Sequence, residues 1–273
     1  MQYQIIAFLA ALTQVSEVLG ANVVPKRAGL SGYIGIQNTQ AFKDLAPYIG
    51  WYSDYNPDTP SVGNVQGVPM LWAGTGSSCD VAAERIQRFK NTVAKSTPKL
   101  MFGFYEPDCN CPYSSQMTVE AAANNWNNLL VPIAKKGTVL GSPSMCKQFD
   151  EDFLTPFKAK ITSPWNITSI HVNKPNLAGI KADVEYYRKK YGKPIFVSEF
   201  ACVHDQGGFS PCSTQAEVDQ FLKDAVKYFQ SQSDVVGYGP SNGAGLGNVV
   251  PLTTSNGQLT ASGRTYLNAI KNL

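Results

Sequence analysis

The sequence contains few charged residues and no long apolar run. Charged residues make up 16% of its 273 residues, and 23 Lys and Arg stand against 20 Asp and Glu, so the formal net charge is only +3. This balance offers no basic surface for DNA or RNA and favours an uncharged partner. No apolar segment approaches the roughly 20 residues that a transmembrane helix needs. We therefore expect neither nucleic acid nor a membrane as a partner.

Motifs for nucleotides and metals are also absent. No GxGxxG or Walker-type sequence follows an early apolar run, and the glycine-rich residues 243–247 read as a flexible loop after the last run. Zinc bound through Cys109 and Cys111 is an alternative, but the chain has only two histidines, His171 and His204, and no CxxC pair. The sequence predicts no metal and no organic cofactor.

The first residues are typical of a secretory signal. A short apolar run at residues 5–12 is followed by Val18, Leu19 and Gly20, which are small or apolar residues ahead of Ala21. We expect residues 1–20 to be a signal peptide and residues 21–273 to form the mature domain; the alternative is a buried N-terminal helix. The C-terminal tail lacks the apolar stretch of a lipid-anchor signal. The predicted location is extracellular or in a cell wall, and we expect a monomer.

Six cysteines fit this location, because exported proteins retain disulfide bonds. Cys202 and Cys212 are close enough in sequence to close one loop, and we expect them to pair. Six cysteines allow 15 pairings, so the partners of the other four remain open. The only glycosylation sequon begins at Asn166. The sequence thus predicts a disulfide-stabilised glycoprotein.

Short apolar runs alternate with longer amphipathic segments along the chain. The runs are mostly continuous, as in parallel strands buried on both faces. They lie at residues 33–36, 49–52, 68–72, 100–104, 139–141, 169–172, 194–197 and 235–238. Eight such runs over this length favour a single-domain α/β fold of the (β/α)₈ TIM-barrel type, and an open doubly wound sheet is the alternative.

Helical patterns fall between most of these runs. They cover residues 81–94, 118–131, 177–190, 214–229 and 261–270. Thr214 and Glu217 form a capping box, and Gly192 follows the third pattern as a helix end requires. Pro132 is expected to end the second helix. Because barrel enzymes place their chemistry at the carboxyl ends of the strands, those ends are where a site is expected.

Two glutamates stand at such ends. Glu106 follows the fourth apolar run, and Glu199 follows the seventh. A carboxylic acid that protonates the leaving oxygen and a carboxylate that attacks or activates water are what glycoside hydrolysis requires. The alternative is that each glutamate caps a helix or pairs with a cation at the rim. Finding both at strand ends favours a catalytic pair.

Several motifs resemble those of glycoside hydrolase family 128, a family of fungal and bacterial β-1,3-glucanases. Glu106 lies in a Tyr-Glu-Pro-Asp element similar to the family's Asn-Glu-Pro-Asp, and Glu199 lies in a Ser-Glu-Phe element similar to its Thr-Glu-Phe. Further similar elements lie at residues 26–30, 51–55, 69–72, 141–143 and 257–260. The resemblance implies a retaining hydrolase with Glu106 as acid/base and Glu199 as nucleophile, their carboxyls about 5 Å apart.

Three elements depart from the family pattern. Tyr105 replaces an Asn that would hold a sugar hydroxyl, and Asn173 stands where the family has a Tyr after strand six. After strand eight, residues 237–241 lack the Trp expected under the sugar. Losing this Trp would reduce the stabilisation of the transition state by on the order of several kcal/mol.

Other residues at strand ends are candidates for binding sugar. Tyr55 and Trp72 are the first choice as aromatic platforms for the apolar face of a sugar ring, and Tyr105 and Tyr238 are further candidates. His171 is expected to orient Glu199, unless it is a structural histidine. Asp54 and Asn173 are candidate binders of hydroxyl groups.

Three functions remain open at this point. The first is a secreted glucanase acting on β-1,3-glucan or its oligosaccharides, and the second is a barrel that binds β-glucan with weak or no catalysis. The third is a structural protein of the cell wall. Linkage specificity, endo or exo attack, turnover by the altered site and oligomeric state are not determined by the sequence.

Overall fold

The computed structural model describes residues 23–147 and 152–273, so the predicted signal peptide lies outside the described residues. The strands are mostly short and fully buried, and they run parallel except where β9 pairs with β8. They are β1 (Gly29–Ser31), β2 (Trp51–Ser53), β3 (Gln66–Gly67), β4 (Met70–Trp72), β5 (Leu100–Phe104), β6 (Val139–Leu140), β7 (Thr168–Lys174), β8 (Ile195–His204), β9 (Ser210–Pro211) and β10 (Val235–Pro240).

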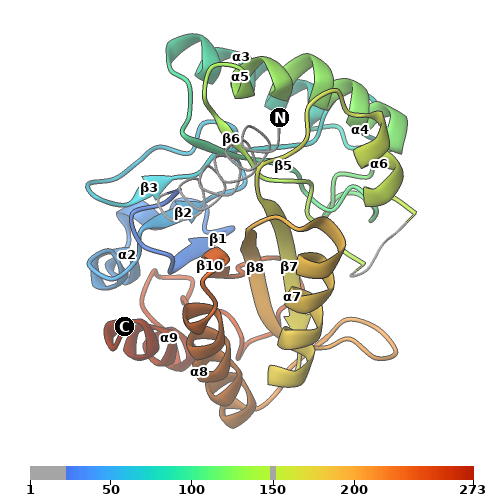
Figure 1. Cartoon of the computed structure of the whole chain (residues 1–273). Coiled ribbons are helices and arrows are strands. Elements are labelled where there is room, and N and C mark those ends of the chain that lie inside the picture. Colours follow the sequence, from blue (N-terminus) through green and yellow to red (C-terminus); the bar gives the residue numbers. More distant parts are fainter. Residues whose placement is uncertain (1–22, 148–151) are drawn as a thin grey trace, which may run out of the picture.

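Helices surround the strands (Figure 1). They are η1 (Ile36–Asn38), α2 (Gln40–Leu45), α3 (Ala82–Lys95), α4 (Val119–Asn125), η2 (Trp126–Leu130), α5 (Val131–Ala134), α6 (Leu154–Lys160), α7 (Leu177–Tyr191), α8 (Gln215–Ser231) and α9 (Ala261–Lys271). Helices α3 to α6 lie on one side of the strands, and α7 to α9 lie on the other. Among the described residues no helix is both long enough and apolar enough to cross a membrane.

The strands form three sheets, with the orders β1-β2-β3, β4-β5-β6 and β7-β8-β10. Isolated parallel bridges connect neighbouring sheets, from Ala28 to Tyr238 and from Gly141 to Ile167. The α/β single-domain class predicted from the sequence is confirmed. The hydrogen-bonded sheets themselves are small and do not form one continuous closed ring.

Three aromatic rings from three different sheets meet inside the molecule. Trp51 of β2 contacts Phe196 of β8 with ring centroids 4.8 Å apart and Phe102 of β5 at 6.0 Å, and the two phenylalanines lie 5.0 Å apart. The glycines beside Trp51 make this possible, because a Cβ atom at Gly29 would lie 2.2 Å from the indole. The sheets therefore share one packed interior.

The first strand was predicted in the wrong place. Residues 33–36 form a turn that leads into η1, and β1 precedes them. Gly32 and Gly35 both adopt positive φ, at 78° and 70°, and Ile34 is exposed. Left-handed backbone interrupts an extended strand, so this apolar run cannot continue one. The other seven apolar runs overlap observed strands.

Helix ends followed the sequence closely, with one exception. Thr214 makes the predicted capping box with Glu217, and Gly192 ends α7 in the left-handed conformation. Pro132 does not end a helix, because it lies in the first turn of α5. The preceding π-helical turn η2 brings the chain to a point where the missing N–H of proline is tolerated. The short helices α2 and α6 were not predicted.

All six cysteines are paired. Cys202 bonds Cys212 as predicted, and the remaining bridges are Cys79–Cys111 and Cys109–Cys146. The last two connect three loops that follow β4, β5 and β6. They hold the segment after Glu106 against its neighbours.

A carboxylate is buried where α7 packs on β7. Asp183 has no exposed surface, and Lys174 Nζ lies 3.5 Å from it and 2.5 Å from Asp205. Burial raises the pKa of Asp183 to about 7, although Lys174 opposes the change. The folded state thus binds this proton more tightly than the unfolded chain, whose Asp has a pKa of about 3.9.

We expect the free energy of unfolding to fall as pH rises from about 4 to about 7, because the buried carboxyl must then lose its proton. Asp183→Asn should remove this dependence, which amounts to about 2–4 kcal/mol by pH 8. Urea unfolding between pH 4 and pH 8 measures it. Asp80→Asn, at an exposed site, is the matched control. Equal pH profiles for wild type and Asp183→Asn would contradict the assignment.

Candidate active site

Three residues at strand ends adopt the left-handed backbone that side chains disfavour. They are Tyr55 after β2, Trp72 at the end of β4 and Glu106 after β5, with φ of 63°, 66° and 47°. Such conformations cost about 1–3 kcal/mol each and persist where surrounding packing enforces them. Their clustering at the carboxyl ends of adjacent strands marks this end of the molecule as the candidate site.

Glu106 is held by contacts at both its backbone and its carboxylate. Its N–H donates to the carbonyl of Ser144, 2.8 Å away. Ser114 Oγ donates to Oε2 at 2.6 Å, and His171 Nδ1 lies 2.8 Å from Oε1. Both carboxylate oxygens therefore have a partner within the protein.

His171 lies in β7 opposite Glu199 in β8, because the register of the two strands pairs these residues. Burial lowers the pKa of His171, but the charge of Glu199 and the hydrogen bond to Glu106 outweigh it and raise the pKa above its ordinary value. The raised pKa favours protonation of the imidazole, and Nδ1 is the ring nitrogen that forms the hydrogen bond with Glu106. The sequence predicted that His171 orients Glu199, whereas its hydrogen bond goes to Glu106.

Two phenols hold Glu199. Tyr55 donates to Oε2 at 2.5 Å, and Tyr105 lies 3.1 Å from Oε2 and 3.4 Å from Oε1. Burial, followed by the charge of Glu199, raises the pKa of both phenols well above its usual range. They remain protonated and act as donors to Glu199.

The two carboxylates lie close together and face one cavity. A carboxylate oxygen of Glu106 and one of Glu199 are within 4.8 Å of each other. A cavity of about 390 Å³ lies above them and is lined also by Tyr105, Asn173 and Ser241. This volume is within the range of small-molecule sites. Further lining residues are Tyr113, Ser114, Cys146, Phe209, Gly243, Ala244, Gly245 and Leu246.

The two residues predicted as the main aromatic platforms do not line this cavity. Trp72 is only 5% exposed: its ring stacks at 6.1 Å on Tyr105, and the guanidinium of Arg85 lies 4.6 Å from it. Its role is to support Tyr105. Tyr55, as described above, contacts Glu199. Asn173 does line the cavity, and among the described residues its buried Oδ1 has no hydrogen-bond partner, so it can accept one from a ligand.

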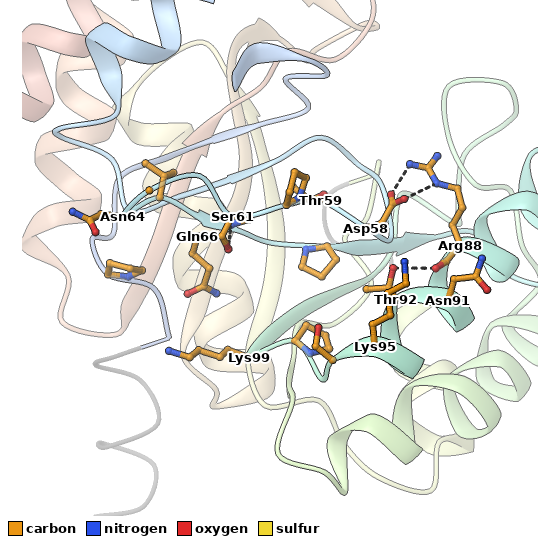
Figure 2. Close-up of a pocket in the computed structure, with 18 residues that line it drawn as sticks. Asp58, Thr59, Ser61, Asn64, Gln66, Arg88, Asn91, Thr92, Lys95 and Lys99 are labelled. Atoms are coloured by element: carbon orange, nitrogen blue, oxygen red, sulfur yellow. Dashed lines mark hydrogen bonds and ion pairs between the residues drawn. The ribbon is translucent and has the colours of Figure 1, made fainter. Parts of the chain in front are cut away.

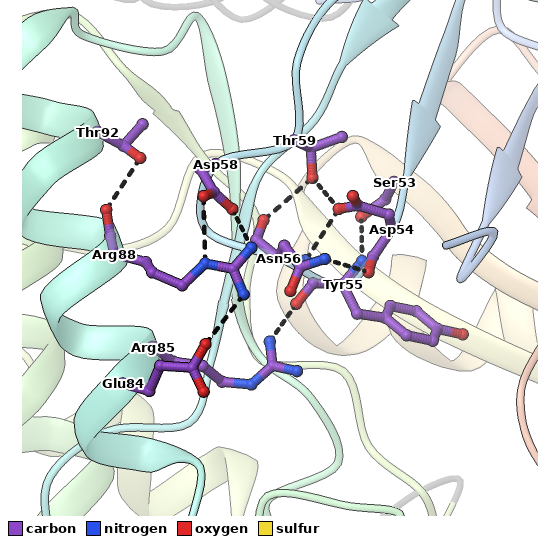
Figure 3. A network of polar contacts seen from close by, with 10 residues as sticks. All are labelled: Ser53, Asp54, Tyr55, Asn56, Asp58, Thr59, Glu84, Arg85, Arg88 and Thr92. Carbon is purple, nitrogen blue, oxygen red and sulfur yellow. Dashed lines mark hydrogen bonds and ion pairs between the residues drawn. The ribbon is translucent and has the colours of Figure 1, made fainter. Parts of the chain in front are cut away.

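Asp54 organises the loop after β2. Figure 3 shows its carboxylate turned toward Asn56 and Thr59, away from the ring of Tyr55. It accepts hydrogen bonds from the Asn56 N–H and from the Thr59 hydroxyl, and Arg85 donates to the carbonyl of Tyr55. Both hydrogen bonds end on Oδ1, and Asp54 does not line the cavity of the two glutamates, so the structure gives it a role within the loop. Contact of Asp54 with a sugar hydroxyl stays a prediction.

Tyr238 was also proposed as a platform and is fully buried instead. Its ring packs on Phe200 and Phe229, and its hydroxyl donates to Gln230. The apolar residues around Tyr238 in the sequence are compatible with core packing as well as with sugar binding, and in the structure Tyr238 packs in the core. At Asn166 the side-chain oxygen accepts the N–H of Leu140, and glycosylation there stays a prediction.

Sequence reasoning missed several lining residues. Ser114, Tyr113, Phe209 and Gly243 lie in irregular loops with no periodic pattern. One signal was available, because Tyr113 and Phe209 are each close to cysteines that bridge loops.

A larger cavity of about 920 Å³ lies elsewhere (Figure 2). It is formed near the beginnings of β3 and β5, where Gln66 and Lys99 lie, and so at the opposite strand ends from the glutamates. Its lining contains no aromatic ring and no histidine. We assign the function to the smaller cavity, because it contains the paired carboxylates.

Glu106, His171 and Glu199 could together reach a cation. In the observed arrangement, however, the imidazole of His171 forms a hydrogen bond with the carboxylate of Glu106, and the phenols donate hydrogen bonds to Glu199. We assign no metal to the site.

The chain is similar to glycoside hydrolases and to related oligosaccharide-binding proteins of known structure. A family model described as glycosyl hydrolase catalytic core matches residues 30–266. A GH128 subgroup VII oligosaccharide-binding protein from Trichoderma gamsii is 38% identical with a TM-score of 0.84, covering 93% of this chain and 96% of that one. Its counterpart from Cryptococcus neoformans is 39% identical with a TM-score of 0.83 and the same coverage.

More distant similarities support the same architecture. A GH128 subgroup I endo-β-1,3-glucanase from Amycolatopsis mediterranei, in complex with laminaritriose, is 21% identical with a TM-score of 0.69, covering 89% of this chain and 99% of that one. This likeness shows the fold. Alkali-sensitive linkage protein 1 of Schizosaccharomyces pombe is 26% identical over 175 residues, or 61% of this chain. The match spans about a third of that relative, 32% of its length.

Proposed function

Because this chain belongs to the glycosyl hydrolase catalytic core family and, within it, to GH128, we propose that it is a receptor for β-1,3-linked gluco-oligosaccharides. The ligand would lie in the cavity above Glu106 and Glu199. The remaining lone pairs of the carboxylates and the free Oδ1 of Asn173 offer acceptors to sugar hydroxyls.

This proposal rests on one observation: both carboxylates accept hydrogen bonds from side chains of the protein itself. A retaining hydrolase needs one carboxyl that delivers a proton and a second that attacks the anomeric carbon. Here Ser114 and His171 take the two oxygens of Glu106, and Glu199 is held between two phenols. The contacts favour Glu106 as an acceptor, whereas an acid/base has to deliver a proton, and this favours recognition over hydrolysis. The phenols on Glu199 are compatible with either function, since a nucleophile is an ionised acceptor as well.

The choice of ligand follows from relatives. The solved structures at 38% and 39% identity are described as oligosaccharide-binding proteins, and the more distant enzyme was solved with laminaritriose. The low charge of the chain agrees with a neutral ligand.

Hydrolysis with retention is the second candidate, and the spacing of the carboxylates favours it. Their oxygens approach within 4.8 Å, and retaining enzymes separate the two carboxyls by about 5 Å. In that case Glu106 would act as acid/base and Glu199 as nucleophile. A proton passing from His171 Nδ1 to Glu106 Oε1 would leave a neutral imidazole and a carboxylic acid able to protonate the leaving oxygen.

We also propose that the three sheets together make a closed barrel of eight parallel strands. Strands β3 and β4 are separated by only Val68 and Pro69, so they count as one strand that joins two sheets. The Ala28–Tyr238 and Gly141–Ile167 bridges support the remaining two junctions. The three aromatic side chains that meet in the interior, Trp51, Phe102 and Phe196, come from strands spaced around such a barrel.

We further propose that the protein is secreted to the extracellular space or a cell wall. Three disulfide bonds support this location, because they persist in oxidising compartments.

The receptor proposal predicts binding without turnover. Isothermal titration with a β-1,3-linked glucose pentamer should give saturable binding, and a β-1,4-linked pentamer should bind more weakly. Chromatography after long incubation should return the β-1,3 pentamer uncleaved.

Two variants separate the candidates. Hydrolysis of the pentamer by wild type would contradict the receptor proposal. If this hydrolysis disappears in Glu199→Gln and persists in the exposed control Glu185→Gln, the hydrolase proposal takes its place. Absence of affinity for every β-glucan tested would overturn both.

A further inference from the structure

Two large aromatic side chains stand exposed at the rim of the cavity. Tyr113 is 71% exposed and Phe209 is 56% exposed, and both line the cavity above the glutamates. The other exposed large apolar residues in the described chain, Ile34, Val81 and Leu273, do not line it. Exposed aromatics gathered at a concave site indicate ligand contact rather than chance.

Each aromatic is presented by a loop that disulfide bonds hold in place. Tyr113 lies two residues after Cys111, which is bonded to Cys79, and the neighbouring Cys109 is bonded to Cys146. Phe209 lies between Cys202 and Cys212, which are bonded to each other. Restrained loops reduce the conformational entropy lost on binding. An exposed aromatic on such a loop is pre-positioned for a ligand.

The two residues come from loops that follow different strands. The sheet orders and the Gly141–Ile167 bridge place the strands in the sequence β5, β6, β7, β8, β10. Tyr113 belongs to the loop after β5, and Phe209 belongs to the turn after β8, beside the loop that follows β10. Glu106 follows the same strand as Tyr113, and Glu199 lies in the strand that precedes Phe209. A Cβ atom at Gly245 of the β10 loop would lie 3.6 Å from the Phe209 ring.

The chemistry of this arrangement suits a chain of sugars. The C–H faces of a glucose ring are apolar and pack on aromatic rings, while its hydroxyls need polar partners such as those at the cavity centre. The phenols of Tyr55 and Tyr105 hydrogen-bond to Glu199, and neither ring is fully exposed, because Tyr105 is buried and Tyr55 is half-buried. The exposed rings at the rim can supply an open ring face.

We propose that Tyr113 and Phe209 form two flanking sugar-binding subsites, one on each side of the sugar held at Glu106 and Glu199. The inference rests on the proposed function of the cavity and adds the residues that set affinity for longer ligands. It requires the ring of Tyr113 but not its hydroxyl.

The test is a titration series with β-1,3-linked glucose oligomers of two to five units. Phe209→Ala and Tyr113→Ala should each weaken binding of the pentamer about two- to tenfold, with a smaller loss for the dimer. Tyr113→Phe and Phe209→Tyr should retain wild-type affinity. Ile34→Ala, which removes an exposed apolar side chain away from the cavity, is the matched control.

The outcomes are distinct. If wild type binds the pentamer and both alanine variants bind it equally well, the flanking subsites are excluded while the receptor stands. If wild type binds no oligomer, the proposed function is overturned, and the flanking subsites are overturned with it. A loss that is equal for dimer and pentamer would point to a general disturbance of the loops and would also overturn the subsites.

Discussion

Replacing Gly243 with Phe is expected to weaken binding of the β-1,3-linked pentamer at least about 100-fold. A Cβ atom at this position would lie 3.5 Å from Glu199 Oε1 and 3.6 Å from the Tyr105 hydroxyl. A larger side chain would therefore extend into the space where the central sugar is proposed to lie. Steric exclusion removes all contacts of that sugar together, so the effect should exceed that of any single lost hydrogen bond.

The backbone should tolerate the change, since φ of Gly243 lies outside the left-handed region. The nearest atom to the added Cβ is Ser241 Oγ at 3.1 Å, the end of a small side chain that can move. Gly243→Ala should give a much smaller loss of affinity. Titration calorimetry measures the affinities, and thermal unfolding confirms that each variant is folded.

Asn242→Phe is the control for this prediction. It places the same side chain on the same loop, at an exposed residue that does not line the cavity. If Gly243→Phe binds the pentamer as wild type does, the ligand does not occupy the space above Glu199. Equal losses for both variants would instead show that the loop, and not the cavity, determines binding.

Trp51→Ala is expected to lower the free energy of unfolding by about 3–5 kcal/mol. Its indole is fully buried, donates to the carbonyl of Arg27 at 3.0 Å and packs between Phe102 and Phe196. Truncation leaves a cavity that neighbours cannot fill, because the surrounding strands are fixed by their hydrogen bonds. This loss is a large part of the 5–15 kcal/mol that stabilises a typical domain.

Urea unfolding under non-reducing conditions measures the change, and Ile34→Ala at an exposed site should alter stability by less than about 0.5 kcal/mol. A change below about 1 kcal/mol in Trp51→Ala would show that the three rings do not pack at a shared centre. The proposed closure of the sheets into one barrel would then lose its main support.

Most of the strands and long helices could be predicted from the sequence, because their signals are local. The apolar run at residues 100–104 coincides with β5, and the Thr214 capping box and Gly192 mark helix ends. The error at residues 33–36 arose because an apolar run resembles a strand unless the φ of its glycines is known. Likewise, Pro132 was expected to stop a helix, and only the preceding π-helical turn shows why the helix continues.

The sequence by itself determined the family, through short motifs in the order that the family has, and it correctly placed Glu106 just after a parallel strand. It placed Glu199 after its strand as well, whereas β8 continues past Glu199 to His204. It also indicated a neutral ligand and a disulfide between Cys202 and Cys212. These properties depend on residue type and on neighbours a few positions away.

Only the tertiary structure decided which side chains form hydrogen bonds with the two carboxylates. Tyr55 and Glu199 are 144 residues apart, and Glu106 and His171 are 65 apart, so their hydrogen bonds depend on strand order and register. The same holds for Trp72, which packing covers, and for Phe209, which its loop exposes. Contacts between distant residues are set by how the sheets assemble, and no local pattern in the chain encodes which side chains will meet there.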